Sequence, residues 1–165
     1  MSAVKRAPSF LSLGCLLLVG AAACSGSSSG SLVKARTAYI VKAEAVCQKA
    51  NDQQKALKTP TSVKQLSPYV DAVVRIADET SAALGKLTPP KKDKADLDKH
   101  VFSPLREQLA KGQAYADRVR TAAKRNDVIE LAKLLSDPPN KTAADLSWMR
   151  HYGFQQCVDA ADTSG

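Results

Sequence analysis

Apolar residues recur at intervals of three and four along most of the chain, which is the spacing of one face of an α-helix. The segment from about Pro68 to Leu87 shows this most clearly. Its inward stripe consists of Val70, Val73, Ala77, Thr80, Leu84 and Leu87, broadened by Val74 and Ile76. No run of alternating polar and apolar residues is long enough to indicate a strand. The pattern therefore predicts an all-α protein.

A first long helix is predicted from about Ala35 to Lys58, before Thr59-Pro60-Thr61 ends it. Its apolar face holds Ile40, Ala43, Cys47, Ala50 and Leu57. The thiol of Cys47 should therefore point into the core. The second helix has two possible starts, a capping box at Ser62 and Gln65, and an N-cap at Ser67 with proline at the first helical position. We expect it to begin at Pro68.

A third long helix should follow Asp93, which is a suitable N-cap. Its apolar positions are Leu97, Val101, Leu105, Leu109, Ala116 and Val119. Ser103-Pro104 interrupts this pattern. An interior proline has no N–H to donate and its ring clashes one turn back, so we expect a kink or a break there.

Two short helices should complete the chain. Asp127 caps the first and Glu130 completes its capping box, and Asp137-Pro138-Pro139 ends it. The second runs from about Lys141 to Tyr152. Gly153 then fits the left-handed position of a Schellman ending, with Phe154 folding back onto Met149. We thus expect a bundle of three long antiparallel helices plus two short C-terminal helices over residues 34–165.

The N-terminal residues have the pattern of an export signal. Lys5 and Arg6 precede an uncharged apolar segment from Phe10 to Ala23. As a helix this segment covers roughly 21 Å, against about 30 Å for the hydrocarbon core of a bilayer. We therefore predict that residues 1–23 are a cleaved signal peptide and that residues 24–33, rich in Ser and Gly, are a flexible tether.

Two enzymes could cleave this signal. Ala21 and Ala23 suit ordinary signal peptidase, whereas Ala22-Ala23-Cys24 resembles the lipobox of bacterial lipoproteins, although Ala21 stands where Leu is usual. Loss of the leader removes Cys15 and leaves three cysteines, an odd number for an exported protein. If Cys24 carries lipid and Cys47 pairs with Cys157, no thiol is left over. We predict that arrangement, with plain secretion as the alternative, and we expect the segment after Phe154 to fray without the disulfide.

The charge of the chain is moderately basic. It is +8 overall and +6 once the leader, with two of the 24 basic residues and none of the acidic ones, is removed. A tethered basic protein can attract anionic head groups or wall polymers. The basic residues that lie closest together are Lys91, Lys92 and Lys94, and Arg118, Arg120, Lys124 and Arg125. Few aromatic residues lie among them, which argues against nucleic-acid binding.

No catalytic, cofactor or metal motif stands out. His100 and His151 fall in different predicted helices, and no serine lies in a nucleophile elbow. Asp96 and His100 share a helix face, but two ligands without a third favour a solvated pair over a metal site. Asp159 and Asp162 are expected to be solvated. The aromatic residues of the C-terminal half could line a ligand pocket between helices, although core packing is the simpler interpretation; they are Tyr115, Trp148, Tyr152 and Phe154.

Two short stretches resemble small, uncharacterised secreted lipoproteins of actinobacteria. They are Ala43-Glu44-Ala45-Val46-Cys47, followed by Ala50-Asn51, and the run from Trp148 through Tyr152-Gly153-Phe154 to Cys157. The resemblance implies an exported, membrane-tethered helical domain and brings no activity with it.

These observations together predict a non-enzymatic binding or interaction module of the cell envelope, without a cofactor. A lipid on Cys24 would hold it at the outer face of the cytoplasmic membrane. Two alternatives remain open. The first is a carrier that holds a small apolar ligand between helices, and the second is a hydrolase whose site has no recognisable motif.

Overall fold

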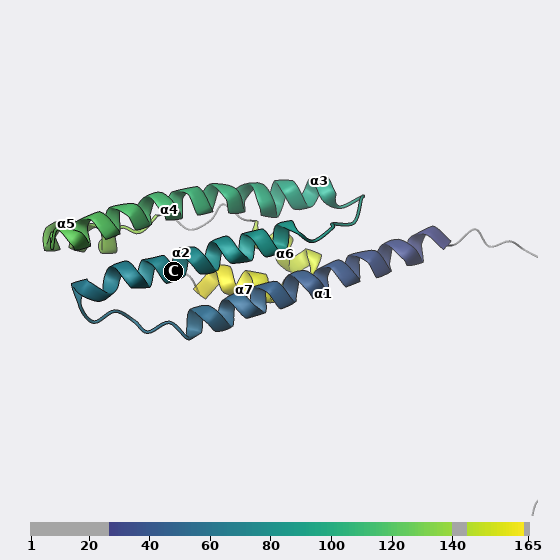
Figure 1. Ribbon diagram of the computed structural model, residues 1–165. Coiled ribbons are helices and arrows are strands. Elements are labelled where there is room, and N and C mark those ends of the chain that lie inside the picture. Colours follow the sequence, from purple (N-terminus) through teal and green to yellow (C-terminus); the bar gives the residue numbers. More distant parts are fainter. Residues whose placement is uncertain (1–26, 140–144, 164–165) are drawn as a thin grey trace, which may run out of the picture.

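The structure is a computed structural model that describes residues 27–139 and 145–163. The described chain is helical and contains no strand, as predicted. The long helices are α1 (Ser27–Lys55), α2 (Val63–Gly85) and α4 (Ser103–Lys124). Figure 1 shows them as three long rods lying side by side.

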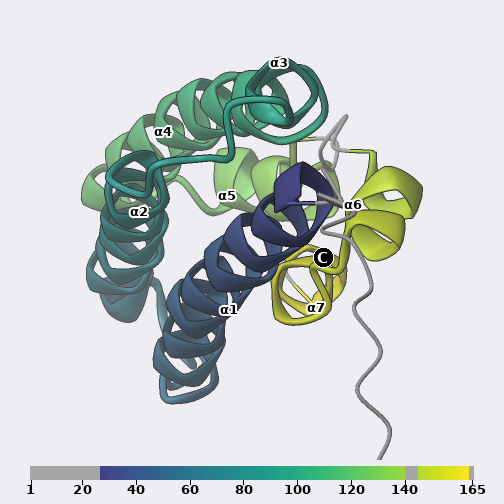
Figure 2. The ribbon, with the colours of Figure 1, turned by 90° about the vertical axis from the view of Figure 1, so that its right-hand side faces the viewer.

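The shorter elements connect these rods and pack against them. They are α3 (Lys94–Leu97), the π-helical turn η1 (Asp98–Phe102), α5 (Val128–Ser136), α6 (Leu146–Tyr152) and α7 (Gln156–Thr163). α1 packs on α2, and α2 packs on α4; α6 contacts η1 and α7, and α7 returns to α1. In Figure 2, α6 and α7 lie on the side of α1 that faces away from α2.

α1 begins earlier than predicted. It starts at Ser27 rather than near Ala35, so residues 27–33, which we expected in the tether, are helical. Each residue added to an existing helix gains a hydrogen bond, so a helix anchored further along can extend through weak formers. The anchor is Arg36, whose side chain is bonded to Asp93. α1 ends at Lys55, shortly before the predicted end.

The predicted start of α2 at Pro68 is wrong. The helix begins at Val63 with Ser62 as its N-cap, and Pro68 lies inside it. Gln65 reaches back, as in a capping box, but its side chain accepts from the N–H of Thr61 rather than from that of Ser62. Val63 and Leu66 pack against a buried cluster, which favours extending the helix by one turn before Pro68. The packing outweighs the single hydrogen bond that Pro68 removes.

The expected interruption at Pro104 takes a specific form. η1 widens the helix by one residue per turn over Asp98–Phe102, directly before the proline, and the N–H of Ser103 bonds to the carbonyl of Asp98. The wider turn accommodates the proline, so α3, η1 and α4 follow one another without a loop.

The C-terminal part confirms two predicted helix ends and adds a helix. The side chain of Asp127 caps α5 through the N–H of Glu130 at 3.0 Å. Gly153 has φ of 114° and ends α6, and the N–H of Phe154 bonds to the carbonyl of Met149 at 2.9 Å, which completes a Schellman motif. α6 starts at Leu146 because Asp145 caps it, so the earlier start at Lys141 falls on residues outside the described range. α7 was not predicted.

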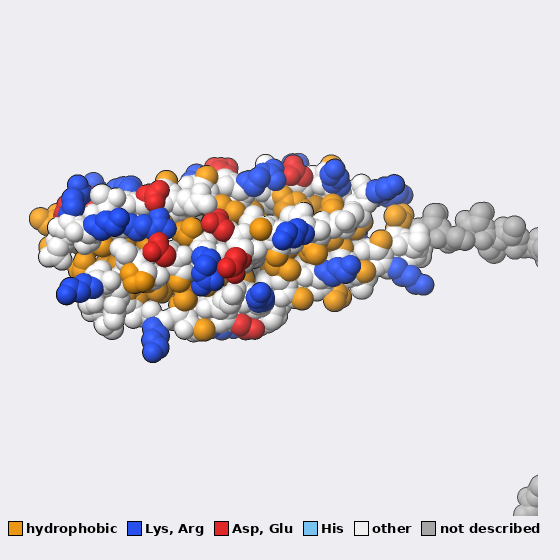
Figure 3. Space-filling view, in the orientation of Figure 1, with side chains coloured by type: hydrophobic (Ala, Val, Ile, Leu, Met, Phe, Trp, Pro, Cys, Tyr) orange, Lys and Arg blue, Asp and Glu red, His pale blue; other side chains and the backbone are white. Residues whose placement is uncertain are grey.

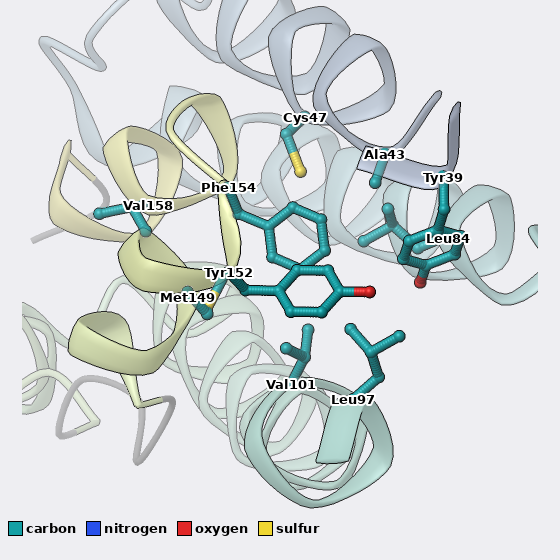
Figure 4. Close-up of a cluster of buried hydrophobic side chains, with 10 residues drawn as sticks. All are labelled: Tyr39, Ala43, Cys47, Leu84, Leu97, Val101, Met149, Tyr152, Phe154 and Val158. Atoms are coloured by element: carbon teal, nitrogen blue, oxygen red, sulfur yellow. The ribbon is translucent and has the colours of Figure 1, made fainter. Parts of the chain in front are cut away.

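Apolar side chains form two separate buried clusters. The larger lies between α1, the end of α2, α3, η1, α6 and α7. Figure 4 shows Tyr152 at its centre with Phe154 between Tyr152 and Cys47. The smaller joins α4, α5 and the start of α2 around Val119 and Leu131. On the face shown in Figure 3, basic and acidic side chains are mixed along the helices.

Candidate functional site

A groove opens between α2 and α4, with a volume of about 380 Å³. This volume lies at the lower end of the range found for small-molecule sites. The apolar residues that line it are Tyr69, Val70, Val73, Val74, Leu105, Leu109, Tyr115, Ala116, Pro138 and Pro139. The valines and leucines among them are only half-buried, so a ligand lying in the groove would cover apolar surface that now meets solvent.

The groove lies between the two buried clusters. Leu105 packs with the larger cluster, and Val70 and Tyr115 pack with the smaller one. Val73, Val74 and Leu109 line the groove but belong to neither cluster. The groove therefore extends along the α2–α4 contact from residues of the smaller cluster to a residue of the larger one.

Gly112 lies in the interior of α4 and lines the groove. Glycine in a helix interior costs about 1 kcal/mol relative to alanine. Close helix packing often explains such a glycine, but a Cβ placed on Gly112 would meet nothing within 4 Å. The residue therefore costs stability without allowing a neighbouring helix to approach. Its effect is to leave the groove wide and the α4 backbone accessible from it.

Polar groups occur at the edge of the groove. The amide of Gln113 donates to the carboxylate of Asp78 at 3.0 Å, which joins α4 to α2 across the opening. Gln108 also borders the groove. The hydroxyl of Tyr115 donates to the carbonyl of Leu134 at 3.0 Å, and burial raises the pKa of this tyrosine. The groove therefore combines apolar walls with a few hydrogen-bonding groups, which is the usual composition of a small-molecule site.

A second concentration of polar groups surrounds Asp93, the residue before α3. Arg36 donates to both oxygens of this carboxylate, at 2.7 and 2.8 Å, and the hydroxyl of Tyr152 donates to Oδ2 at 2.8 Å. Asp93 is only 7% exposed. The hydrogen bonds from Arg36 lower its pKa although burial acts in the opposite direction. Burial and the bond to Asp93 both raise the pKa of Tyr152.

Aromatic rings extend this cluster as a stack. The guanidinium of Arg36 lies 5.0 Å from the ring centre of Tyr152, Tyr152 stacks on Trp148 at 4.9 Å, and Trp148 stacks on His100 at 4.9 Å. His100 in turn pairs with Asp145 at 3.3 Å. The stack ties α1, η1 and α6 together. Since both oxygens of Asp93 already accept hydrogen bonds from the protein, we interpret this cluster as structural.

The predicted disulfide between Cys47 and Cys157 is confirmed, with the two Cα atoms 4.9 Å apart. Beside it, the carboxylate of Glu44 accepts from the backbone N–H groups of Gln155, Gln156 and Cys157 at 3.0, 2.7 and 3.3 Å. These are the unpaired donors at the start of α7, so a side chain of α1 caps that helix. The disulfide and Glu44 therefore both fasten α7 to α1.

The structure separates the aromatic residues that we considered as a pocket. Trp148, Tyr152 and Phe154 belong to the larger cluster, whereas Tyr115 belongs to the smaller one and borders the groove. The groove itself was not predicted. Gly112, as an isolated glycine within a helical pattern, was the one signal in the sequence that could have indicated it.

Two other residues considered from the sequence are Cys24 and His100. Cys24, the predicted lipid attachment residue, lies outside the described residues, as does the predicted signal peptide, residues 1–23. His100 pairs with Asp145 rather than with Asp96. Within residues 27–139 and 145–163, no three His, Cys, Asp or Glu side chains are grouped so that they could hold a metal ion. None of the helices in that part of the chain is long and apolar enough to cross a membrane.

Comparison of the chain with protein-family models, with curated proteins and with solved structures gives no match.

Proposed function

We propose that the protein is a binding module of the cell envelope, without catalytic activity, that holds a small apolar ligand in the groove between α2 and α4. The groove, with its half-buried valines and leucines and its open position at Gly112, is the observation that carries this proposal. It favours the ligand carrier over a module that only contacts other proteins. Its volume is equivalent to roughly a dozen water molecules, at about 30 Å³ each, which suits one small molecule.

The proposal places the protein outside the cytoplasm, as the lipoproteins that it resembles would be. After removal of residues 1–23, acyl chains on Cys24 would tether it to the outer face of the cytoplasmic membrane. The disulfide between Cys47 and Cys157 supports export, because disulfides persist in oxidising compartments. We also propose that α1, α2 and the α3–α4 rod run antiparallel, since short connections join their successive ends.

Binding is tested by titrating the exported chain with N-phenylnaphthylamine, a neutral fluorophore that brightens in apolar surroundings. We expect saturable binding to one site per chain, little affected by salt because the groove walls carry no cation. Organic extraction of the purified protein followed by mass spectrometry should also release an apolar compound. Fluorescence that never saturates would contradict the proposed site.

The location is tested by the Cys24→Ser variant. Two acyl chains give stable membrane anchoring, so the variant should move from the membrane fraction to the soluble fraction. Mass spectrometry of the N-terminus should find a diacylated Cys24 in the wild-type protein. An unmodified Cys24 would support plain secretion instead, and would leave the binding test unaffected.

A further inference from the structure

The two groups of basic residues found in the sequence differ in how their charges are paired. On α4, Arg118 pairs with Glu130, Arg120 pairs with Asp71 and Asp117, and Arg125 lies 3.8 Å from Asp127. Opposite charges therefore largely offset this group. This pairing removes α4 as the strongest candidate for an anion-binding surface.

The other group remains cationic. The connection from α2 to α3, together with the first residue of α3, includes four exposed lysines, namely Lys86, Lys91, Lys92 and Lys94. The acidic residue among them, Asp93, is buried and bonded to Arg36. Among the described residues, no ion pair within 4.0 Å involves these lysines. Their charge is therefore directed at solvent.

The same end of the bundle contains the first turns of α1. The Arg36–Asp93 bond fixes the α2–α3 connection beside α1. A hollow of about 380 Å³ between them is lined by Leu32, Val33, Arg36, Thr37, Pro90, Lys92 and Asp93. Lys34 is exposed here, and Val33 is 64% exposed. In Figures 1 and 3 this is the right-hand end, where the described chain begins. We call Lys34, Lys86, Lys91, Lys92 and Lys94 the basic end.

We propose that the basic end binds the surface of an anionic lipid bilayer. This inference rests on the proposed function in one respect: Cys24 precedes Ser27, the first residue of α1, by three residues, so a lipid on Cys24 would hold this end next to the membrane. Lysines close to an anionic leaflet attract it, and the exposed Val33 adds an apolar contact at the interface. The anchor and the basic end then act as two signals for one surface.

The position of the groove follows from this arrangement. With the basic end against the head groups, the long helices extend away from the membrane, and α5 lies at the far end (Figure 1). The groove runs between α2 and α4, along the side of these helices. It would therefore open into the space beside the membrane rather than into the bilayer.

The test measures binding of the exported Cys24→Ser chain to vesicles, so that no acyl anchor contributes. Vesicles of phosphatidylcholine with phosphatidylglycerol should bind it, and vesicles of phosphatidylcholine alone should not. Each lysine near an anionic surface contributes about 1 kcal/mol, so neutralising three should weaken binding about a hundredfold. The variant is Lys91→Gln, Lys92→Gln and Lys94→Gln.

A matched control variant has the same net charge as this triple variant, but its substitutions lie at the opposite end of the bundle. The control variant is Lys58→Gln, Lys64→Gln and Lys124→Gln. These three exposed lysines lie in the α1–α2 connection, near the start of α2 and at the end of α4. We expect it to bind anionic vesicles nearly as the parent does. Equal weakening of both triple variants would show that only net charge matters and would overturn the proposal. So would binding to isolated cell wall but not to anionic vesicles.

This experiment and the test of the lipid anchor fail independently. The vesicle measurement uses a chain that has no anchor, so an unmodified Cys24 in the wild-type protein would leave its outcome unchanged. Conversely, Cys24 could prove to be acylated while the Cys24→Ser chain shows no preference for phosphatidylglycerol vesicles. That result would support the lipid tether and refute membrane binding by the basic end.

Discussion

Replacing both Cys47 and Cys157 by alanine should destabilise the protein mainly through the unfolded chain. The disulfide joins residues 110 positions apart. For a loop of that length the chain-entropy model gives about 4 to 5 kcal/mol, an upper value because strain in the folded state reduces it. A domain of this size has roughly 5 to 15 kcal/mol in total, so the variant should remain folded but much less stable. Alanine avoids placing a new hydroxyl in the core, where Cys47 is buried.

Urea unfolding, followed by circular dichroism, measures this loss. With a slope of about 2 kcal/mol per molar, the midpoint should fall by roughly 2 M. The native structure of α7 should change little, because Glu44 still caps it and Val158 remains buried. This revises our expectation from the sequence that the segment after Phe154 depends on the disulfide. An unchanged midpoint would refute the entropic argument, and rapid proteolysis at α7 in native buffer would refute the role assigned to Glu44.

Two further predictions concern single carboxylates. Glu44→Gln should lose about 1 to 2 kcal/mol of unfolding free energy because an amide accepts more weakly from the start of α7, whereas Glu107→Gln, at an exposed site, should lose almost none. Thermal melts of both variants decide this, and equal melting temperatures would contradict it. The pKa of Asp93 is lowered in the folded state, chiefly by Arg36, so its stabilising effect is present above about pH 4, near its unfolded value, and is lost as the pH falls through the folded value. Asp93→Asn should cost about 2 to 3 kcal/mol at pH 7, less than the loss of a partner in a fully buried ion pair, because Arg36 is half-exposed. The variant should also lose less stability than the wild type as the pH falls into the acid range. An acid loss as steep as in the wild type would contradict this assignment.

Local patterns predicted the parts of this fold that depend on neighbouring residues. The stripe on α1 correctly placed Cys47 in the core, and Gly153 correctly marked a left-handed helix ending, because both follow from helix periodicity and backbone sterics alone. Asp127 was likewise identified as a cap from its position. These features need no knowledge of what packs against them.

The predictions that were wrong concern features that depend on contacts between residues far apart in the sequence. Pro68 was taken as a helix start because the packing of the preceding turn against α4 and α5 is not visible in the sequence. Asp93 was expected to cap a helix with its side chain, but Arg36, 57 residues earlier, takes that carboxylate instead. The groove is the clearest case, since its walls come from α2, α4 and Pro138-Pro139, which lie far apart in the sequence. A helical pattern shows which face is apolar and does not show where the partner faces leave a gap.

The same limit applies to charge. Arg118, Arg120 and Arg125 are close in sequence, and the acids that pair with two of them come from other helices. Lys91, Lys92 and Lys94 surround an acid that the fold buries. Density of charge along the chain was therefore a poor guide to the charge that the surface presents.

The groove is tested most directly by filling it at Gly112 and measuring binding and stability on the same samples. Gly112→Leu should reduce the affinity for N-phenylnaphthylamine at least about tenfold, while the free energy of unfolding stays level or rises, because leucine is about 0.8 kcal/mol better than glycine in a helix, a Cβ at this position meets no atom within 4 Å, and the rest of the side chain would cover the apolar walls of the groove. Ala110→Leu, an exposed position on α4 that does not line the groove, should bind the probe as the wild type does. A fully stable Gly112→Leu variant with undiminished binding would contradict the account.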